Sequence, residues 1–176
     1  MLTIQKLKLN DMHETMLDGF ERYQKTDKVY VFQRGLLLEK EDYFEDNWTV
    51  DNKRDIVTHL IQTINDGGAV ITATHAQQII GFAVIEAMAF KITYVYRELS
   101  YFHVSQLYRG QKIGEALFEK SKEVARYLGA EKLYIGSHPS VQTQNFYRKM
   151  GCVLATEICP EIYNREPRDI QLEIEV

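Results

Sequence analysis

The feature that most constrains the fold of this chain is a short glycine-bearing loop between an apolar run and an amphipathic one. Leu99 to Val104 is typical of a buried strand, whereas Glu115 to Leu128 carries apolar residues at helical spacing. The loop between them is Leu107-Tyr108-Arg109-Gly110-Gln111-Lys112-Ile113-Gly114. A strand, a glycine loop and a helix start form an arrangement that binds phosphate, because the first N–H groups of the helix are free and its dipole favours an anion.

Two kinds of residue in the loop support phosphate binding. Gly110 and Gly114 have no Cβ, so a ligand can approach the main chain closely, and Arg109 and Lys112 add positive charge. The loop taken alone is equally consistent with an ordinary turn that carries solvated basic residues, because short glycine motifs often match by chance. The rest of the chain has to decide between the two interpretations.

Size and charge exclude several classes of protein. With 176 residues the chain can build a proper core, and we expect a single domain over residues 1–176. The net charge of -4 argues against electrostatic binding of nucleic acid. No apolar run approaches the roughly 20 residues of a membrane span, and residues 1–10 lack the apolar core of a signal peptide. We therefore expect a cytoplasmic protein with no nucleic-acid or membrane partner.

The cysteines and histidines do not suggest a metal site. Cys152 and Cys159 lack the spacing of metal ligands and indicate reduced thiols. The 5 histidines stand singly along the chain, and none has a carboxylate or cysteine at ligand spacing. We expect no structural or catalytic metal.

Hydrophobic periodicity and turn residues divide the chain into strands and helices. The expected strands cover residues 3–8, 69–74, 79–89, 94–104, 132–136, 152–158 and 169–175, and the expected helices cover residues 10–25, 51–66, 115–128 and 140–150. Within 26–50, residues 29–32 and 36–38 look extended around Arg34-Gly35, and the acidic stretch 39–48 is expected to be a loop, either a binding lid or a solvated excursion. This order predicts one α/β domain with a strand–helix–strand unit around the glycine loop.

Three features in this order resemble the GNAT superfamily of acyl-CoA-dependent N-acetyltransferases. Residues 109–114 are similar to the family's pyrophosphate loop, (Gln/Arg)-x-x-Gly-x-(Gly/Ala), and residues 98–104 to the strand that precedes it. Residues 145–152, Asn-Phe-Tyr-Arg-Lys-Met-Gly-Cys, look like the family's late helix and the glycine turn after it. The resemblance implies a mixed, mostly antiparallel twisted sheet of about seven strands flanked by about four helices, with a splayed parallel pair at the cofactor site.

The resemblance also implies which residues bind acetyl-CoA as a co-substrate. The matching positions are Phe102, His103 and Val104 on the strand, Arg109, Gly110, Gln111, Lys112, Ile113 and Gly114 in the loop, and Ser140, Asn145 and Tyr147 in the late helix. The chain departs from the family pattern at two positions. Lys112 replaces the central glycine of the loop, and Ser140 stands where the family often has an asparagine, so that its hydroxyl either contacts the cofactor or merely caps the helix.

Two residues are candidates for catalysis by resemblance and chemistry. A primary amine with a pKa of about 10 needs a base at neutral pH, and Glu98 is the candidate. Period-2 alternation places Glu98 on one face with Ser100, Phe102 and Val104. Tyr147 is the candidate acid for the leaving thiolate. In the alternative interpretation, Glu98 is an exposed residue at the strand start that pairs with Arg97 or Lys91, and Tyr147 is a core aromatic. His103, His138 and Tyr101 are lesser candidates.

The sequence thus predicts an N-acetyltransferase that moves an acetyl group to a primary amine by direct attack in a ternary complex. The acceptor is expected to be a small molecule or a peptide. The alternative is a non-catalytic acyl-CoA-binding regulatory module, whereas a P-loop nucleotidase is excluded because no Gly-Lys-Ser/Thr follows the glycines. Exposed strand edges and Tyr94-Val95-Tyr96 suggest a homodimer.

Overall fold

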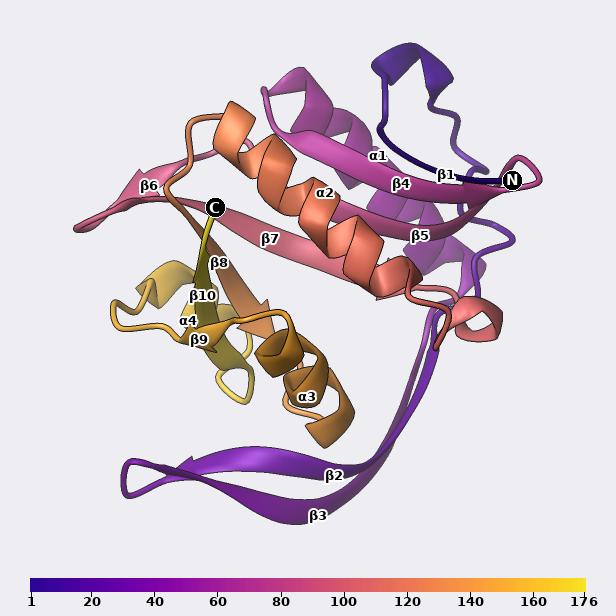
Figure 1. The fold of residues 1–176 in the computed structure, drawn as a ribbon. Helices are drawn as coiled ribbons and strands as arrows, with labels where there is room; N and C mark the ends of the chain where they lie inside the picture. The colour runs from indigo at the N-terminus through magenta and orange to yellow at the C-terminus, as the bar shows by residue number, and fades with distance from the viewer.

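A twisted sheet runs through the molecule and carries helices on both faces (Figure 1). The computed structural model describes residues 1–176. The sheet has 8 strands in the order β1-β4-β5-β7-β8-β10-β9, with β6 paired to β7. The strands are β1 Leu2–Lys6, β4 Ala69–His75, β5 Gln78–Ile85, β6 Phe90–Lys91, β7 Val95–Val104, β8 Lys132–Ser137, β9 Val153–Leu154 and β10 Ile170–Glu175. Only β7 and β8 pair in parallel, which confirms the expected fold class.

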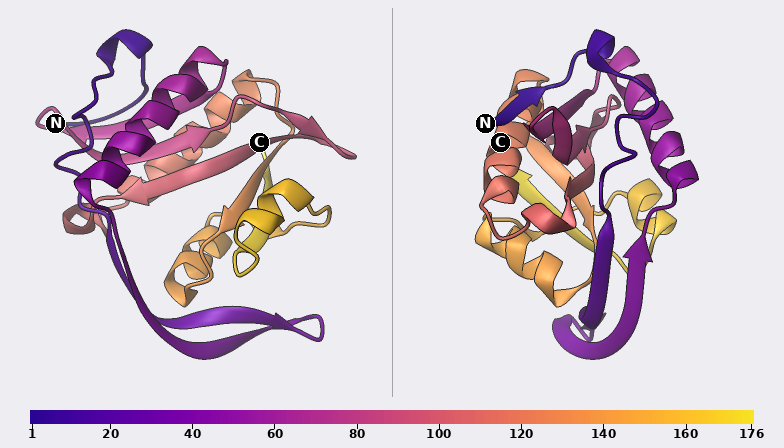
Figure 2. Two further views of the ribbon diagram at one scale, coloured as in Figure 1. Left: turned by 180° about the vertical axis from the view of Figure 1, so that it is seen from behind. Right: turned by 90° about the vertical axis from the view of Figure 1, so that its right-hand side faces the viewer.

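The helices cover the two faces of the sheet separately. They are α1 Val50–Asn65, α2 Ile113–Tyr127, α3 Val141–Lys149 and α4 Pro160–Arg165, with 3₁₀ turns at Leu9–Asp11 and Gln106–Tyr108. Figure 2 shows α1 and α2 on opposite sides of the sheet. Adjacent residues of β4 feed the two cores, because Ile71 packs in the core under α2 and Val70 in the core under α1. No helix is long and apolar enough to cross a membrane.

The parallel pair β7–β8 opens into a V. The two strands pair only from Tyr96 to Glu98 against Lys132 to Tyr134. Beyond that point β7 continues to Val104 along β5, and β8 continues to Ser137 along β10. The main-chain groups that face the gap therefore have no strand partner, so a ligand with amide groups can pair with them.

A long hairpin, β2 Tyr23–Gln33 and β3 Leu36–Asn47, leaves the body near the end of β7 and passes beside α3 (Figure 1). At its base the Gln106 N–H donates to the Glu21 carbonyl (3.2 Å), and further out the Tyr30 N–H donates to the Pro139 carbonyl (2.8 Å). The hairpin thus connects the end of β7 to the start of α3. It crosses the open end of the V.

Three expectations about local structure are wrong. Residues 10–25 do not form a helix but a 3₁₀ turn, further turns and the start of β2. Residues 39–48 are not a loop, because most of them belong to β3. The strand expected over 152–158 shrinks to β9, and the loop after it contains α4, whose first residue is Pro160.

Candidate active site

The start of α2 presents a row of free main-chain donors. The N–H groups of residues 110–115 donate to no acceptor in the protein, and the first helical bond is from Ala116 to the Lys112 carbonyl. Lys112 is the N-cap residue, yet its side chain caps nothing. Its φ of 62° and the 76° of Gly110 curl the loop so that successive N–H groups turn outward. Such a concave row of donors at a helix start binds phosphate.

This row borders a cavity of about 440 Å³ between the end of β7, the loop and α3. Of the residues expected to bind the cofactor, those lining it are Phe102, His103, Val104, Arg109, Gly110, Lys112, Gly114 and Tyr147. The other lining residues were not among those expected to bind the cofactor, although the quoted motifs include some of them; they are Gln24, Tyr108, Glu115, Gln142, Thr143, Phe146 and Lys149. The structure therefore brings the strand, the loop and the late helix to one cavity.

Four of the expected cofactor residues do not line this cavity. Gln111 is exposed, and its side-chain amide donates to the Leu107 carbonyl (3.3 Å). The Ile113 side chain is buried in the core, and Asn145 is exposed on α3. Ser140 caps α3, since its hydroxyl accepts a hydrogen bond from the Thr143 N–H (3.2 Å). The capping alternative for Ser140 is the one that the structure adopts.

Tyr147 forms the wall of the cavity with other aromatic rings. Its ring lies 5.4 Å from that of Phe146 and 6.2 Å from that of Phe102, between centroids. Gly114 makes room for this group, because a Cβ there would lie 3.3 Å from Phe146. The Tyr147 hydroxyl makes no hydrogen bond to another residue, and burial raises the pKa of the phenol above its ordinary value. It is a protonated donor without a partner.

Arg109 fastens the loop to the strand before it. Its Nε donates to the Val104 carbonyl at 3.0 Å, where β7 ends. Burial lowers the pKa of the guanidinium, and no carboxylate bonds to it. The terminal nitrogens of Arg109 are thus available for an anion.

Glu98 lies in a different cavity from Tyr147. This cavity, of about 590 Å³, lies between α1, β7 and α4. Glu98 is bonded to Arg165, and burial raises the pKa of its carboxyl, an effect that Arg165 opposes. The parallel pairing of β7 ends at Glu98, so this residue sits at the vertex of the V.

The expectation that Glu98 shares a face with Phe102 and Val104 is wrong. In the pairing with β5, Leu99 faces Ile85 and Tyr101 faces Val84, which leaves Ser100 as a bulge. The bulge shifts the alternation by one residue. Glu98 and Ser100 therefore point to the α1 side, whereas Phe102 packs against Phe118 on the α2 side.

Comparison with known proteins identifies the family to which the chain belongs. The sequence model described as the acetyltransferase (GNAT) family matches residues 33–152, which is more than half of the chain. The chain belongs to the GNAT family. It is an acetyltransferase of this type. None of the curated proteins matches the sequence at a significant level.

Solved structures with the same fold include several GNAT acetyltransferases. One is a putative streptothricin acetyltransferase from Bacillus anthracis in complex with acetyl coenzyme A, with TM-score 0.69, 20% identity, and coverage of 100% of this chain and 99% of that one. A nourseothricin acetyltransferase has TM-score 0.69, 17% identity, and coverage of 99% and 98%. The PaiA N-acetyltransferase of Thermoplasma acidophilum with coenzyme A has TM-score 0.62, 13% identity, and coverage of 100% and 99%. These likenesses show that the fold is that of the GNAT proteins.

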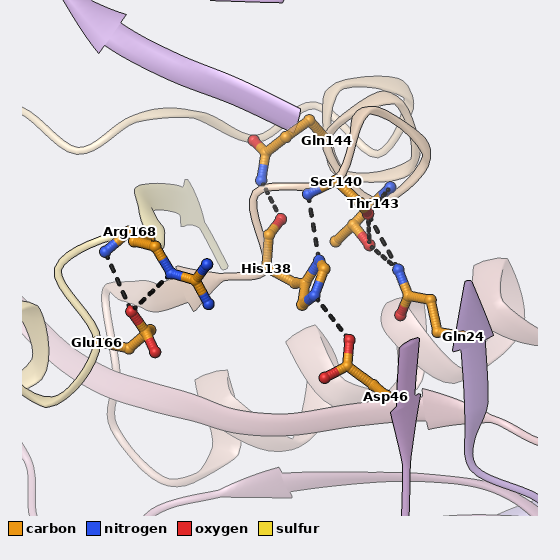
Figure 3. A network of polar contacts seen from close by, with 8 residues as sticks. All are labelled: Gln24, Asp46, His138, Ser140, Thr143, Gln144, Glu166 and Arg168. Atoms are coloured by element: carbon orange, nitrogen blue, oxygen red, sulfur yellow. Dashed lines mark hydrogen bonds and ion pairs between the residues drawn. The ribbon is translucent and has the colours of Figure 1, made fainter. Parts of the chain in front are cut away.

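The hairpin of this GNAT chain is tied to the start of α3 by a polar network (Figure 3). Gln24 donates to the Ser140 hydroxyl (3.0 Å), and Asp46 pairs with His138 Nε2 (3.1 Å). His138 Nδ1 accepts the Ser140 N–H (3.1 Å), so the proton of the neutral ring resides on Nε2. Both nitrogens of His138 are therefore engaged, and the network fixes the position of the hairpin.

The described side chains contain no group of three or more His, Cys, Asp or Glu residues arranged to hold a metal ion. Tyr96, one of the aromatic residues that suggested a homodimer, is fully buried and donates to Glu173 at 2.9 Å. The homodimer stays a prediction.

Proposed function

We propose that the protein moves an acetyl group from acetyl-CoA to a primary amine of a small molecule or peptide, by direct attack in a ternary complex. The observation that carries this proposal is that one cavity combines a row of free N–H donors with the unpartnered phenol of Tyr147. The first feature suits a pyrophosphate and the second a leaving thiolate. Their occurrence together favours an acyl-CoA enzyme over a simple phosphate-binding protein.

The residues present fit acetyl-CoA. The free N–H groups of residues 110–115 and the unpaired Arg109 would hold the pyrophosphate. Beyond Glu98 the edge of β7 that faces the gap is unpaired, and Phe102 and the Val104 N–H offer main-chain groups there to the pantetheine amides and the thioester carbonyl. The main chain of His103 instead pairs with Phe82 of β5, and the Val104 carbonyl accepts from Arg109. Bound acetyl-CoA supplies an activated acetyl thioester, and the protein contributes orientation and proton transfer.

Glu98 is proposed as the base that removes a proton from the acceptor amine. A carboxyl whose pKa is raised by burial is a stronger proton acceptor than an ordinary one. Its cavity also contains Asp66, Glu86 and Glu161, and this excess of carboxylates over His59 and Arg165 attracts a cationic amine. We place the acceptor on this side of the sheet.

Tyr147 is proposed as the acid that protonates the leaving thiolate. The phenol is a weaker acid than a thiol with a pKa of about 8.5, so the proton moves only as the thiolate forms beside it. The hydroxyl makes no hydrogen bond within the protein and is free to donate. Similar structures named for streptothricin and nourseothricin acetylation make amines of that class the first acceptors to test.

A screen for acetyl-CoA-dependent thiol release tests the proposal. The panel contains streptothricin-class antibiotics, aminoglycosides, polyamines, amino acids and peptides, each with and without protein. We expect thiol release that requires one amine class. Binding of CoA without release in the presence of any amine contradicts the proposal and supports the acyl-CoA-binding module.

A further inference from the structure

One buried arginine has no partner in the protein. The side chain of Arg22, just before β2, is only 6% exposed, and its Nε and Nη1 atoms make no hydrogen bond. Its guanidinium carbon lies 5.8 Å from the centroid of the Trp48 ring, which is a weak substitute for a hydrogen bond. A buried, unpaired charge is unfavourable, so an unpartnered arginine indicates a ligand that supplies the missing acceptor.

No carboxylate makes a direct ion pair with Arg22. Asp46 is the carboxylate nearby, and its Oδ2 atom is already paired with His138. Burial lowers the pKa of Arg22, the charge of Asp46 opposes this shift, and repulsion by Arg109 adds to it. Burial is the main cause that lowers the pKa of His103 and of His138, and the charge of Arg22 adds to it at both rings. The one carboxylate near Arg22 is therefore hydrogen-bonded to His138 and makes no ion pair with Arg22 itself.

The position of Arg22 is fixed at the mouth of the V. The preceding residue, Glu21, bonds through its N–H to the Ser105 hydroxyl (3.2 Å) and through its carbonyl to the Gln106 N–H (3.2 Å). Ser105 and Gln106 lie in the chain between β7 and the phosphate loop. The guanidinium of Arg22 packs on the Trp48 ring, which lies 4.8 Å from the ring of His103 between centroids, and His103 lines the cavity beside the loop.

We propose that Arg22 and Arg109 together bind the pyrophosphate of the acyl-CoA. Two arginines without bonded carboxylates, beside a row of free N–H donors, form a site for a multiply charged anion. Arg109 reaches this anion from the loop, and Arg22 reaches it from the base of the hairpin, so the hairpin helps to hold the cofactor. The inference rests on the proposed binding of acyl-CoA.

The test compares Arg22→Gln with Arg34→Gln, which removes the same charge at the exposed turn of the hairpin. Calorimetry measures the affinity for CoA, and thermal melts measure stabilisation by inorganic pyrophosphate. We expect Arg22→Gln to weaken CoA binding about tenfold to a hundredfold, as for one lost charge-assisted bond, and to reduce the pyrophosphate effect. Arg34→Gln should change neither, and Arg22→Lys should keep part of the affinity.

A second readout separates binding from a structural role. Because Arg22 is unpaired without ligand, Arg22→Gln should melt at the same or a higher temperature than the wild type when no CoA is present. A lower melting temperature with unchanged CoA affinity overturns the inference, and so does an effect on the KM of the amine alone. If the wild type itself binds no CoA, the proposed function fails as well. This outcome differs from failure of the Arg22 inference alone, in which the wild type binds CoA and Arg22→Gln binds it equally well.

Discussion

Replacement of Tyr147 by phenylalanine isolates the proposed acid. The ring is 6% exposed and packs on Phe146 and Phe102, and Tyr147→Phe keeps these contacts. The hydroxyl makes no hydrogen bond in the protein, so its loss should leave the free energy of unfolding unchanged within about 1 kcal/mol. General acid catalysis typically contributes roughly 10²–10⁴ in rate. We therefore expect kcat to fall at least a hundredfold while the affinity for CoA stays within about twofold.

The assay is steady-state thiol release with the acceptor found in the screen, together with calorimetry of CoA binding. Tyr127→Phe is the matched control, because Tyr127 is 85% exposed at the end of α2 and lies outside the cavity. Its kcat should be unchanged. Since burial raises the Tyr147 pKa above its ordinary value of 10.0, the wild-type rate should not fall with rising pH below that value. An unchanged kcat in Tyr147→Phe would refute the assignment of the acid.

Four further changes test the rest of the account. Arg109→Ala should weaken CoA binding about tenfold or more, and normal affinity would show that the loop does not hold pyrophosphate. Lys112→Gly relieves a φ of 62° and should raise the free energy of unfolding by up to about 1 kcal/mol, measured by urea titration, while lowering CoA affinity through the lost charge; a loss of stability would contradict this. Glu98→Gln should lower turnover by about 10² or more without affecting CoA affinity, and an unchanged rate would remove Glu98 from the mechanism. Burial and nearby Glu166 raise the Asp169 pKa from 3.8 to about 7, so the part of the wild-type stability that depends on this carboxyl is lost as the pH rises from 4 towards 7. Asp169→Asn should recover about 2 kcal/mol of the free energy of unfolding at pH 8, after a discount for solvent screening, and almost none at pH 4. An equal gain at both pH values would contradict the reasoning.

The sequence predicted the helices and strands in which buried residues recur at the regular spacing of a helix or of a strand. The glycine loop, α2, and the strand and helix after it were identified because their apolar residues recur at helical or strand spacing between clear stops such as Gly129 and Gly151. The cap at Ser140 also followed from local chemistry. These elements line most of the cavity beside the loop, so the sequence could predict that the strand, the loop and the late helix meet there.

The hairpin was not predictable from the same signals. In residues 41–48 alternate side chains are partly buried, but two of these are Asp42 and Asp46. The sequence therefore lacks the alternation of apolar and polar residues that would predict a strand. Leu17 and Phe20 are buried by successive turns rather than by a helix. Two apolar residues three positions apart are compatible with either structure, so their spacing does not distinguish a helix from turns. Gln24 therefore had no signal that could place it at the cavity beside the loop.

The bulge at Ser100 shows a further limit of periodic reasoning. Alternation along β7 placed Glu98 with Phe102, and one extra residue moved it to the opposite face. Bulges depend on the register with the neighbouring strand, which a single strand's sequence does not contain. The position of Glu98 on the α1 side of the sheet could thus be read only from the tertiary structure.

The central claim is direct transfer of an acetyl group from acetyl-CoA to an amine. It is tested by incubating the protein with acetyl-CoA that carries an isotopically labelled acetyl group and with the acceptor from the screen, followed by mass spectrometry of both the acceptor and the intact protein. The account predicts one labelled acetyl group on an acceptor nitrogen and none on the protein. A labelled protein that passes its acetyl group to the amine in a later step, or an acceptor that is never labelled, would contradict it.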